Sequence, residues 1–487
     1  MLLGMSRLGR VRGTVEGWYN PHRRHAAPST HWSGDELLMH EYTPEIDDLA
    51  QQIFDFARKR TALDRVSLGA ARTEADLATA CGPTVTPDGL GGAEALRVFT
   101  EVLHDASLSV DYTRYLSFVP AAPTEASVLF DLVVGACSIY GGSWIEGAGA
   151  VHAENEALRW LSDLAGLPAE AGGVFVPGGT VGNLSAMVAA RGQALERVVG
   201  VRPDRWVFLA SSQAHSSVKA GADVMDADVV AVPVEDDLTM SGAAVGKALD
   251  RYGDRVAGVV ASAGTTNLGL SDDLRGIGEV CHQRNVWFHV DGAYGGAALA
   301  APSAHGLFDG VELADSFIVD PHKWLFAPFD CCALLYREPA RAQAVHAQHA
   351  EYLDFLDEWG DWNPSDFAIH LTRRARGLPF WFSLATHGTD AYADAIQVTL
   401  DLAQAASRRI DAVAHLELAH TPSLSVVVFR RLGWDADQYT DWTVRTMKDG
   451  TAFVVPSRYQ GEPVFRFCFV NPRTTVADID IIIDALA

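Results

Sequence analysis

Short apolar runs alternate with longer segments of helical periodicity through the central part of the chain. Each run is bounded by Gly, Pro or polar residues, which is typical of short strands buried on both faces of a sheet. Strands that alternate with helices predict a mostly parallel sheet, and ligands of such sheets bind at the carboxyl ends of the strands. The predicted strands are 174–176, 206–209, 229–232, 259–261, 286–288, 316–319 and 333–335.

The segments on either side of this region have other patterns. Residues 1–43 are rich in Arg, His, Pro and Gly without a clear period, so we expect an irregular arm. We expect three parts in all: an amino-terminal arm and helical segment (1–111), a large domain (112–375) and a small α+β domain (376–487). The predicted helices of these parts are 46–56, 96–103, 126–139, 151–165, 371–414 and 476–486, and the predicted outer strands are 424–429 and 464–470.

Composition places the chain among globular proteins and excludes several partners. Of 487 residues, 48 % are hydrophobic and 21 % are charged, which is the balance of a folded protein with a large core. The net charge of −24, without a dense basic run, would repel the phosphate backbone of nucleic acid. Six scattered cysteines fit neither a disulfide framework nor a metal site and suit the reducing cytoplasm. No apolar run reaches the roughly 20 residues that span a bilayer, so we expect no membrane segment.

Two charged residues follow two of the predicted strands. Lys323 stands in the sequence Asp-Pro-His-Lys-Trp directly after 316–319, and Asp291 follows 286–288. Most lysines are solvated surface charges, so neither residue is informative alone. Together they are what a pyridoxal phosphate site needs, because the lysine forms a Schiff base with the cofactor aldehyde and the aspartate pairs with the pyridine nitrogen.

Three polar turns follow other predicted strands. The turn from Gly178 to Asn183 offers glycines, the hydroxyl of Thr180 and a helix terminus, which together suit a phosphate. His215 and the turn that contains Thr266 follow two further strands. Each has a structural alternative, namely a tight glycine turn, a hydrogen-bonded structural histidine and an ordinary polar turn.

Other reaction classes lack their motifs. The glycine turn has neither the Gly-Lys-Ser/Thr of nucleoside triphosphate loops nor the GxGxxG spacing of dinucleotide sites. The chain has no GxSxG element, and Ser216 beside His215 does not make a catalytic triad by adjacency. A protease or esterase is therefore not expected.

The combined motifs resemble those of the group II pyridoxal-phosphate-dependent amino acid decarboxylases, with the aromatic amino acid decarboxylases a better match than the glutamate decarboxylases. The likeness runs from about Tyr112 to the end of the chain and is most specific at Gln213–Ser217, His289–Gly296 and Asp320–Cys331. It implies the α/β fold of the fold-type I (aspartate-aminotransferase-like) enzymes, with a mostly parallel sheet, a helical amino-terminal segment and a small α+β domain. It also implies release of carbon dioxide from an L-amino acid, expected to be aromatic, to give the amine.

The resemblance implies roles for individual residues. Lys323 would be the Schiff-base lysine, Asp291 the partner of the pyridine nitrogen and His215 the residue that stacks on the cofactor ring and assists catalysis. Tyr352 would protonate the carbon that has lost carbon dioxide, on a loop that reaches the neighbouring site of a homodimer. Position 320 is Asp where some relatives have Asn near the phosphate. The remaining cofactor contacts would be Ala293, Gly179, Thr180, Thr266 and His322.

Candidates for substrate binding lie before the first predicted strand. We expect Tyr115, Phe118, Tyr140 and Trp144 to line an aromatic pocket and Glu146 to face the substrate, where it would select a cationic group. Ordinary core packing is the alternative for the aromatic residues, and an apolar pocket would equally accept leucine or phenylalanine. Alternatives for the reaction are aldehyde synthesis, transamination and carbon–carbon cleavage on the same scaffold. A non-catalytic binding protein is the alternative from another class, and the intact Lys323, Asp291 and His215 argue against it.

Overall fold

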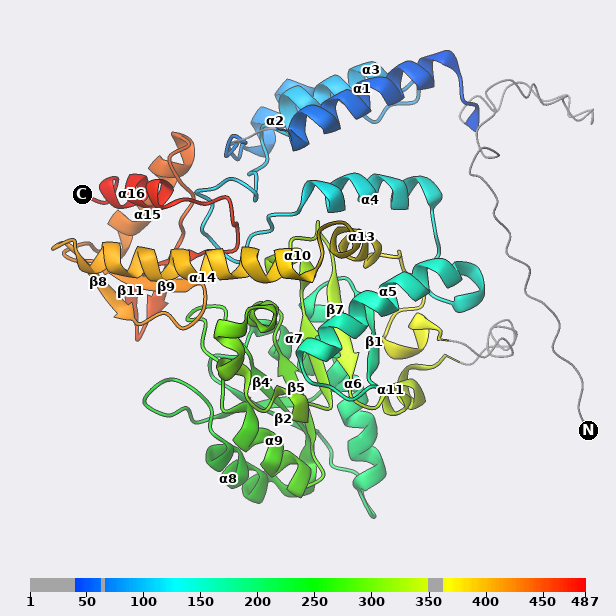
Figure 1. The fold of residues 1–487 in the computed structure, drawn as a ribbon, viewed down its shortest axis with the longest axis vertical. Helices are drawn as coiled ribbons and strands as arrows, with labels where there is room; N and C mark the ends of the chain where they lie inside the picture. Colours follow the sequence, from blue (N-terminus) through cyan, green and yellow to red (C-terminus); the bar gives the residue numbers. More distant parts are fainter. Residues whose placement is uncertain (1–39, 63–65, 349–361) are drawn as a thin grey trace, which may run out of the picture. The chain divides into compact units, whose positions relative to one another are not determined.

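The structure, a computed structural model, describes residues 40–62, 66–348 and 362–487 (Figure 1). It divides into two compact units, residues 1–51 and 52–487. The described part of the first unit contains the start of helix α1 (Pro44–Thr61). Most of the predicted amino-terminal arm lies outside the described residues. The second unit contains both sheets of the protein, and the predicted boundaries at 111/112 and 375/376 stay a prediction.

Helices form the first part of the second unit. They begin at N-caps where the sequence supplies one: Thr73 accepts the N–H of Asp76 at α2, and Thr124 accepts the N–H of Ser127 at α4. A π-helical turn at Phe99–Leu103 continues α3. The elements are α2 (Glu74–Cys81), α3 (Gly92–Val98), α4 (Glu125–Cys137) and α5 (Trp144–Leu164).

A seven-stranded sheet forms the centre of this unit, as the alternation of apolar runs and helices predicts. Its strand order is β1-β7-β6-β5-β4-β2-β3, and the strands are parallel except β7, which runs antiparallel to both of its neighbours. The predicted α/β class with a mostly parallel sheet is confirmed. The strands are β1 (Gly172–Val176), β2 (Val207–Ser211), β3 (Asp228–Val232), β4 (Val256–Ser262), β5 (Trp287–Asp291), β6 (Ser316–Val319) and β7 (Cys332–Tyr336).

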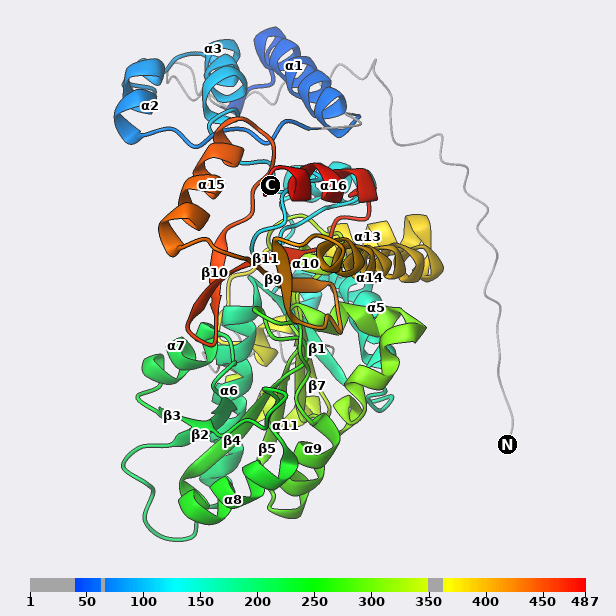
Figure 2. The ribbon, with the colours of Figure 1, turned by 90° about the vertical axis from the view of Figure 1, so that its left-hand side faces the viewer.

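Helices cover both faces of this sheet (Figure 2). Successive residues of each strand pack into different cores, so that Phe208 lies in the core under α6 and Leu209 in the core under α5, α8 and α9. Both faces are buried, which explains why the strands read as continuous apolar runs. The helices are α6 (Gly179–Arg197), α7 (Ser216–Val224), α8 (Gly242–Tyr252), α9 (Leu274–Gln283), α10 (Pro321–Trp324) and α11 (Pro339–His346).

The carboxyl-terminal part is built on a four-stranded antiparallel sheet of order β10-β11-β9-β8. The helical stretch predicted over 371–414 contains two helices, and Gly388 separates them at φ 79°. Glycine tolerates this left-handed backbone, so the helix ends there. The elements are α13 (Leu378–His387), α14 (Thr389–Asp411), β8 (Leu416–His420), β9 (Val426–Arg431), α15 (Ala436–Lys448), β10 (Pro456–Tyr459), β11 (Glu462–Cys468) and α16 (Val476–Asp484).

None of the helices formed by the described residues is long and apolar enough to cross a membrane.

Candidate active site

A cavity of about 360 Å³ lies where several strands of the large sheet end. Its walls come from the turn after β1, the starts of α6 and α7, the turns after β4 and β5, and α10 after β6. The predicted cofactor contacts all line it: Gly179, Thr180, His215, Thr266, Asp291, Ala293, His322 and Lys323. Residues from distant parts of the chain thus meet at the edge where a parallel sheet binds ligands.

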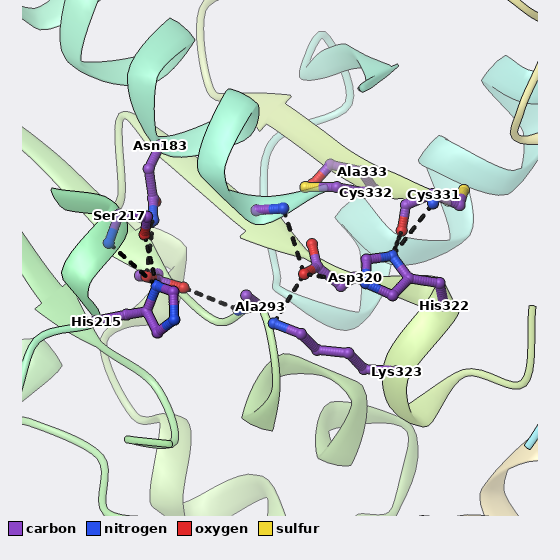
Figure 3. A network of polar contacts seen from close by, with 12 residues as sticks. Asn183, His215, Ser217, Ala293, Asp320, His322, Lys323, Cys331, Cys332 and Ala333 are labelled. Carbon is purple, nitrogen blue, oxygen red and sulfur yellow. Dashed lines mark hydrogen bonds and ion pairs between the residues drawn. The ribbon is translucent and has the colours of Figure 1, made fainter. Parts of the chain in front are cut away.

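Lys323 extends from the short helix α10 toward this cavity (Figure 3). Its ammonium lies 2.8 Å from Oδ2 of Asp320, and 24 % of its side chain is exposed. Burial would lower the pKa of Lys323, but the charges of Asp320 and, more weakly, Asp291 outweigh burial and raise the pKa above its ordinary value. Lys323 is therefore an ammonium ion held in place by a buried carboxylate.

Asp291 ends β5, and its carboxylate is fixed by donors on both oxygens. Oδ1 accepts the backbone N–H of Ala293 (3.1 Å), and Oδ2 accepts the side-chain amide of Asn183 (2.9 Å). Asn183 is 1 % exposed, and its own oxygen lies 2.8 Å from Nε2 of His289, behind the carboxylate. Burial lowers the pKa of His289 to about 4, so this ring is neutral and its Nε2–H is the donor to Asn183.

The same asparagine reaches the histidine on the other side of the cavity (Figure 3). The second hydrogen of its amide goes to Oγ of Ser217 (2.8 Å), and that hydroxyl lies 2.8 Å from Nδ1 of His215. The backbone N–H of Ser217 also points at Nδ1 (3.2 Å), so Nδ1 is an acceptor. The proton of a neutral His215 is then on Nε2.

The glycine turn packs closely against the lysine-bearing segment. Gly178 has φ 114°, which only glycine adopts easily, and the N–H of Gly179 points at Oδ2 of Asp320 (3.3 Å). A Cβ at Gly179 would lie 3.1 Å from that oxygen and 3.2 Å from the Cβ of Ala293. Thr180 is exposed, with its hydroxyl at the first turn of α6. The turn leaves no room for larger side chains.

His322 lies beside this cluster and is held by Cys331, the residue before β7. Its Nδ1 lies 2.7 Å from the carbonyl of Cys331, and its Nε2 is 3.8 Å from Oδ2 of Asp320. Burial lowers the pKa of His322 despite the opposing charge of Asp320. The thiol of Cys332 is next to the same carboxylate; burial first, and then the charge of Asp320, raise the pKa of that thiol well above its ordinary value.

The predicted substrate residues do not line this cavity. Tyr115 is buried and packs edge-on against Phe453, with ring centroids 5.0 Å apart, as the core-packing alternative would have it. The hydroxyl of Tyr140 donates to the carbonyl of Leu371 (3.0 Å). Phe118, Trp144 and Glu146 lie outside the cavity lining as well, and Glu146 accepts a hydrogen bond from Ser143 (2.8 Å). The substrate role of all five stays a prediction. Tyr352 and the acidic loop around it lie outside the described residues.

Comparison with known proteins assigns the chain to a family. The family model described as the pyridoxal-dependent decarboxylase conserved domain matches residues 109–432. The chain belongs to the pyridoxal-dependent decarboxylases. This decarboxylase is 29 % identical over 399 residues to an aromatic-L-amino-acid decarboxylase of Bacillus atrophaeus, and the match covers 78 % of the chain and 81 % of that protein.

Solved structures of other proteins share this fold. The Oryza sativa TDC with PLP and tryptamine has a TM-score of 0.84 at 22 % identity, over 92 % of this decarboxylase and 98 % of that chain. The Rhodiola rosea 4-hydroxyphenylacetaldehyde synthase has a TM-score of 0.82 at 22 % identity, over 91 % and 97 % of the two chains. These likenesses confirm the fold-type I architecture. The decarboxylase is a carboxy-lyase that uses pyridoxal phosphate.

The residues at the cavity fit that cofactor. The set combines a lysine amine, a carboxylate fixed by two donors, and a glycine turn at a helix terminus, which are the groups that an aldehyde, a pyridine nitrogen and a phosphate require. One buried oxygen, Oδ1 of Asp320, has no hydrogen-bond partner among the described residues.

Sequence reasoning missed several residues of the cavity. Asn183 and Asp320 were recognised in their motifs without a role, and Ser217, Phe329 and Asp330 also line the cavity. The position of Asn183 on the first turn of the helix after the glycine turn was a usable signal, because that turn faces the sheet edge. The motif from Asp320 to Cys331 contains Phe329 and Asp330, but strand and helix periodicity could not place them at the cavity, since they come from an irregular segment between α10 and β7.

Proposed function

We propose that this enzyme decarboxylates an aromatic L-amino acid to the corresponding amine, with Lys323 as the residue that bonds to the cofactor. The main support for the proposal is that the eight predicted cofactor contacts line one cavity. The roles assigned to these residues require that all of them reach the same cofactor. Asp291 would pair with the pyridine nitrogen, His215 would stack on the ring with Ala293 on the opposite side, and Gly179, Thr180, Thr266 and His322 would complete the site.

Bound pyridoxal phosphate supplies a ring that accepts the electrons left when carbon dioxide departs. The protein's part is to position the cofactor and the substrate and to control where protons lie. Asp291, held by the Ala293 N–H and Asn183, would place its carboxylate beside the pyridine nitrogen of the bound cofactor. His215 receives bonds on Nδ1 and so presents Nε2 to the cavity.

Tyr352 is proposed as the acid that donates a proton to the substrate's α-carbon. This role comes from the position of the tyrosine after the lysine, where decarboxylases of the family carry it. Family members with phenylalanine there tend to form aldehydes, so tyrosine favours the amine. The fold match to an aldehyde synthase keeps aldehyde formation as the alternative product.

An aromatic substrate has two supports. The relative from Bacillus atrophaeus is named for aromatic L-amino acids, and the Oryza sativa structure contains tryptamine. In this chain Phe329 lines the cavity beside His322 and leaves 54 % of its surface exposed, which suits contact with a planar side chain. Leucine or phenylalanine would also suit such a surface.

We also propose that the enzyme is a cytoplasmic homodimer in which the Tyr352 loop reaches the neighbouring site. All six cysteines are free thiols, which suits a reducing compartment. Helix α4 has an exposed apolar face, formed by Leu129, Leu132 and Val133, which a second copy of the chain would cover.

The test begins with a panel of L-amino acids, scored for carbon dioxide release and for amine and aldehyde products. We expect amine from tryptophan, tyrosine or a related aromatic substrate. Lys323→Ala should abolish the visible absorbance band of the bound cofactor, whereas Lys219→Ala, which removes an exposed lysine on α7, should leave it intact. A Lys323→Ala enzyme with an unchanged band would disprove the lysine assignment.

A second substitution tests the proton donor. Tyr352→Phe should suppress amine formation while the cofactor stays bound, and Tyr252→Phe on α8 serves as the matched control. Full amine yield from Tyr352→Phe would exclude the proposed role. Aldehyde as the main product of the wild-type enzyme would favour the alternative reaction.

A further inference from the structure

The carboxylate of Asp320 is buried in the wall of the cavity, at 1 % exposure (Figure 3). Its Oδ2 receives the ammonium of Lys323 and the N–H of Gly179, whereas Oδ1 has no hydrogen-bond partner among the described residues. Buried carboxylate oxygens without partners are rare because they lose hydration without compensation. Among the described residues, the donors to this buried carboxylate are Lys323, Gly179 and the weakly donating thiol of Cys332.

The charges around Asp320 come from three elements. Lys323 and His322 face it from α10, the thiol of Cys332 faces it from β7, and Asp291 at the end of β5 lines the same cavity. Burial alone would raise the pKa of Asp320, but Lys323 and His322 outweigh burial and hold the pKa below its ordinary value. Asp320 is thus an anion neutralised by Lys323.

Cofactor binding would change both the hydrogen bonding of Asp320 and the neutralisation of its charge. A phosphate at the glycine turn would compete with Asp320 for the N–H of Gly179 and would place further negative charge beside a buried carboxylate. Once Lys323 is bonded to the cofactor, it no longer offers Asp320 a free ammonium. Two adjacent acidic groups in a protein interior do not both stay fully ionised, and they titrate as a pair.

We propose that Asp320 and the cofactor phosphate share one proton, which the enzyme takes up when the cofactor binds. The carboxylate, a phosphate dianion and one proton from solvent combine to give an O–H···O hydrogen bond between the two acids, and no bond to carbon or phosphorus changes. This inference rests on the assignment of the phosphate to the Gly178–Thr180 turn in the proposed function. It makes cofactor affinity fall as pH rises, because binding consumes a proton.

The experiment compares cofactor-free wild-type enzyme with Asp320→Asn and Asp320→Ser. Asp478→Asn is the matched control, because Asp478 is a buried carboxylate that is ion-paired with Arg114 and lies outside the cavity lining. Each protein is titrated with pyridoxal phosphate in weakly buffered solution containing a pH indicator, which counts protons taken up per site. The visible band is recorded at the same time to follow protonation of the lysine–cofactor bond separately, and the dissociation constant is measured from pH 7 to pH 9.

We expect the wild type and Asp478→Asn to take up as much as one proton per site more than the two neutral variants at position 320. The ratio of the wild-type Kd to the Kd of Asp320→Asn should grow with pH, by up to about tenfold per pH unit. Equal proton counts, or a ratio that does not change with pH, would overturn the inference. So would neutral variants that bind the cofactor more weakly than wild type at pH 9. A wild-type enzyme that binds no pyridoxal phosphate would instead contradict the proposed function.

Discussion

Asn183 connects the two sides of the candidate active site through a single side chain. Its amide hydrogens go to Asp291 and Ser217, its oxygen receives His289, and Ser217 in turn fixes His215. Every hydrogen-bonding group of the amide is used, and the side chain is buried. In such a network the loss of one member leaves several partners unsatisfied at once. Asn183 is thus a positioning residue for both proposed ring contacts.

Replacing Asn183 by Leu keeps a similar volume and removes all three hydrogen bonds. Unsatisfied buried groups cost about 1–3 kcal/mol each, so we expect cofactor affinity and kcat/KM to fall about tenfold or more. Asn183→Asp should be worse, because it places a second carboxylate against Asp291. Cofactor titration and steady-state kinetics measure both effects.

The matched control is Asn471→Leu, which removes another buried asparagine that donates to the carbonyl of Asp111. It should lower stability without a selective loss of cofactor. If Asn183→Leu binds the cofactor as well as Asn471→Leu does, the network is structural and does not position Asp291.

At the scale of elements, a third buried histidine, His346, connects α11 to α6. Nε2 of His346 lies 3.0 Å from the carbonyl of Ser185, and the residue is 6 % exposed. Burial lowers the pKa of His346 to about 4. The ring is therefore neutral at pH 7 and donates its Nε2–H to Ser185.

This contact predicts a loss of stability in mild acid. An unfolded chain protonates His346 near its ordinary pKa of about 6.5, whereas the folded protein does so only near pH 4. The unfolded state thus binds more protons between these values, and the free energy of unfolding falls as pH drops from about 6.5 to 4, by up to about 3 kcal/mol from this residue. Above pH 7 the contribution is complete and constant.

Urea unfolding of the cofactor-free enzyme at pH 7 and pH 5 measures the effect. His346→Gln retains a donor for Ser185 but does not titrate, so the difference between its two midpoints should be smaller than in wild type. His152→Gln, at an exposed position on α5, is the control. Equal pH effects in all three proteins would show that His346 does not contribute.

At the scale of the whole molecule, the sequence predicted the placement of residues that lie at or just after the ends of strands. Asp291 ends β5 and Lys323 follows β6, and because these strands pair in parallel, they bring the two residues to one edge. The same reasoning could not place Tyr115, because its packing partner Phe453 lies far along the chain in the carboxyl-terminal part. The role of Asn183 was also hidden, since its partners depend on how α6, α7 and β5 pack.

The apolar face of α4 leads to the last prediction, which concerns assembly. One side of the helix packs on α13, where Phe130 stacks on Phe382 at 4.1 Å between centroids. On the other side Leu129, Leu132 and Val133 leave 45–47 % of their surface exposed, at the i, i+3, i+4 spacing of a continuous stripe. A stripe of this kind on a helix that is already packed on its other side suits an isologous contact with a second copy.

Leu132→Glu should therefore convert a dimer, with twice the chain mass of 52.5 kDa, into a monomer. Light scattering after size-exclusion chromatography measures the mass, and Val444→Glu on α15, at a 39 % exposed position, is the control. Because Tyr352 is proposed to reach the neighbouring site, the monomer should also lose amine formation. Mixing the Leu132→Glu protein with Tyr352→Phe chains should restore little activity, because the altered face of α4 cannot form the dimer contact. A Leu132→Glu protein that stays dimeric would place the interface elsewhere, and a monomeric wild type with full activity would exclude the shared site.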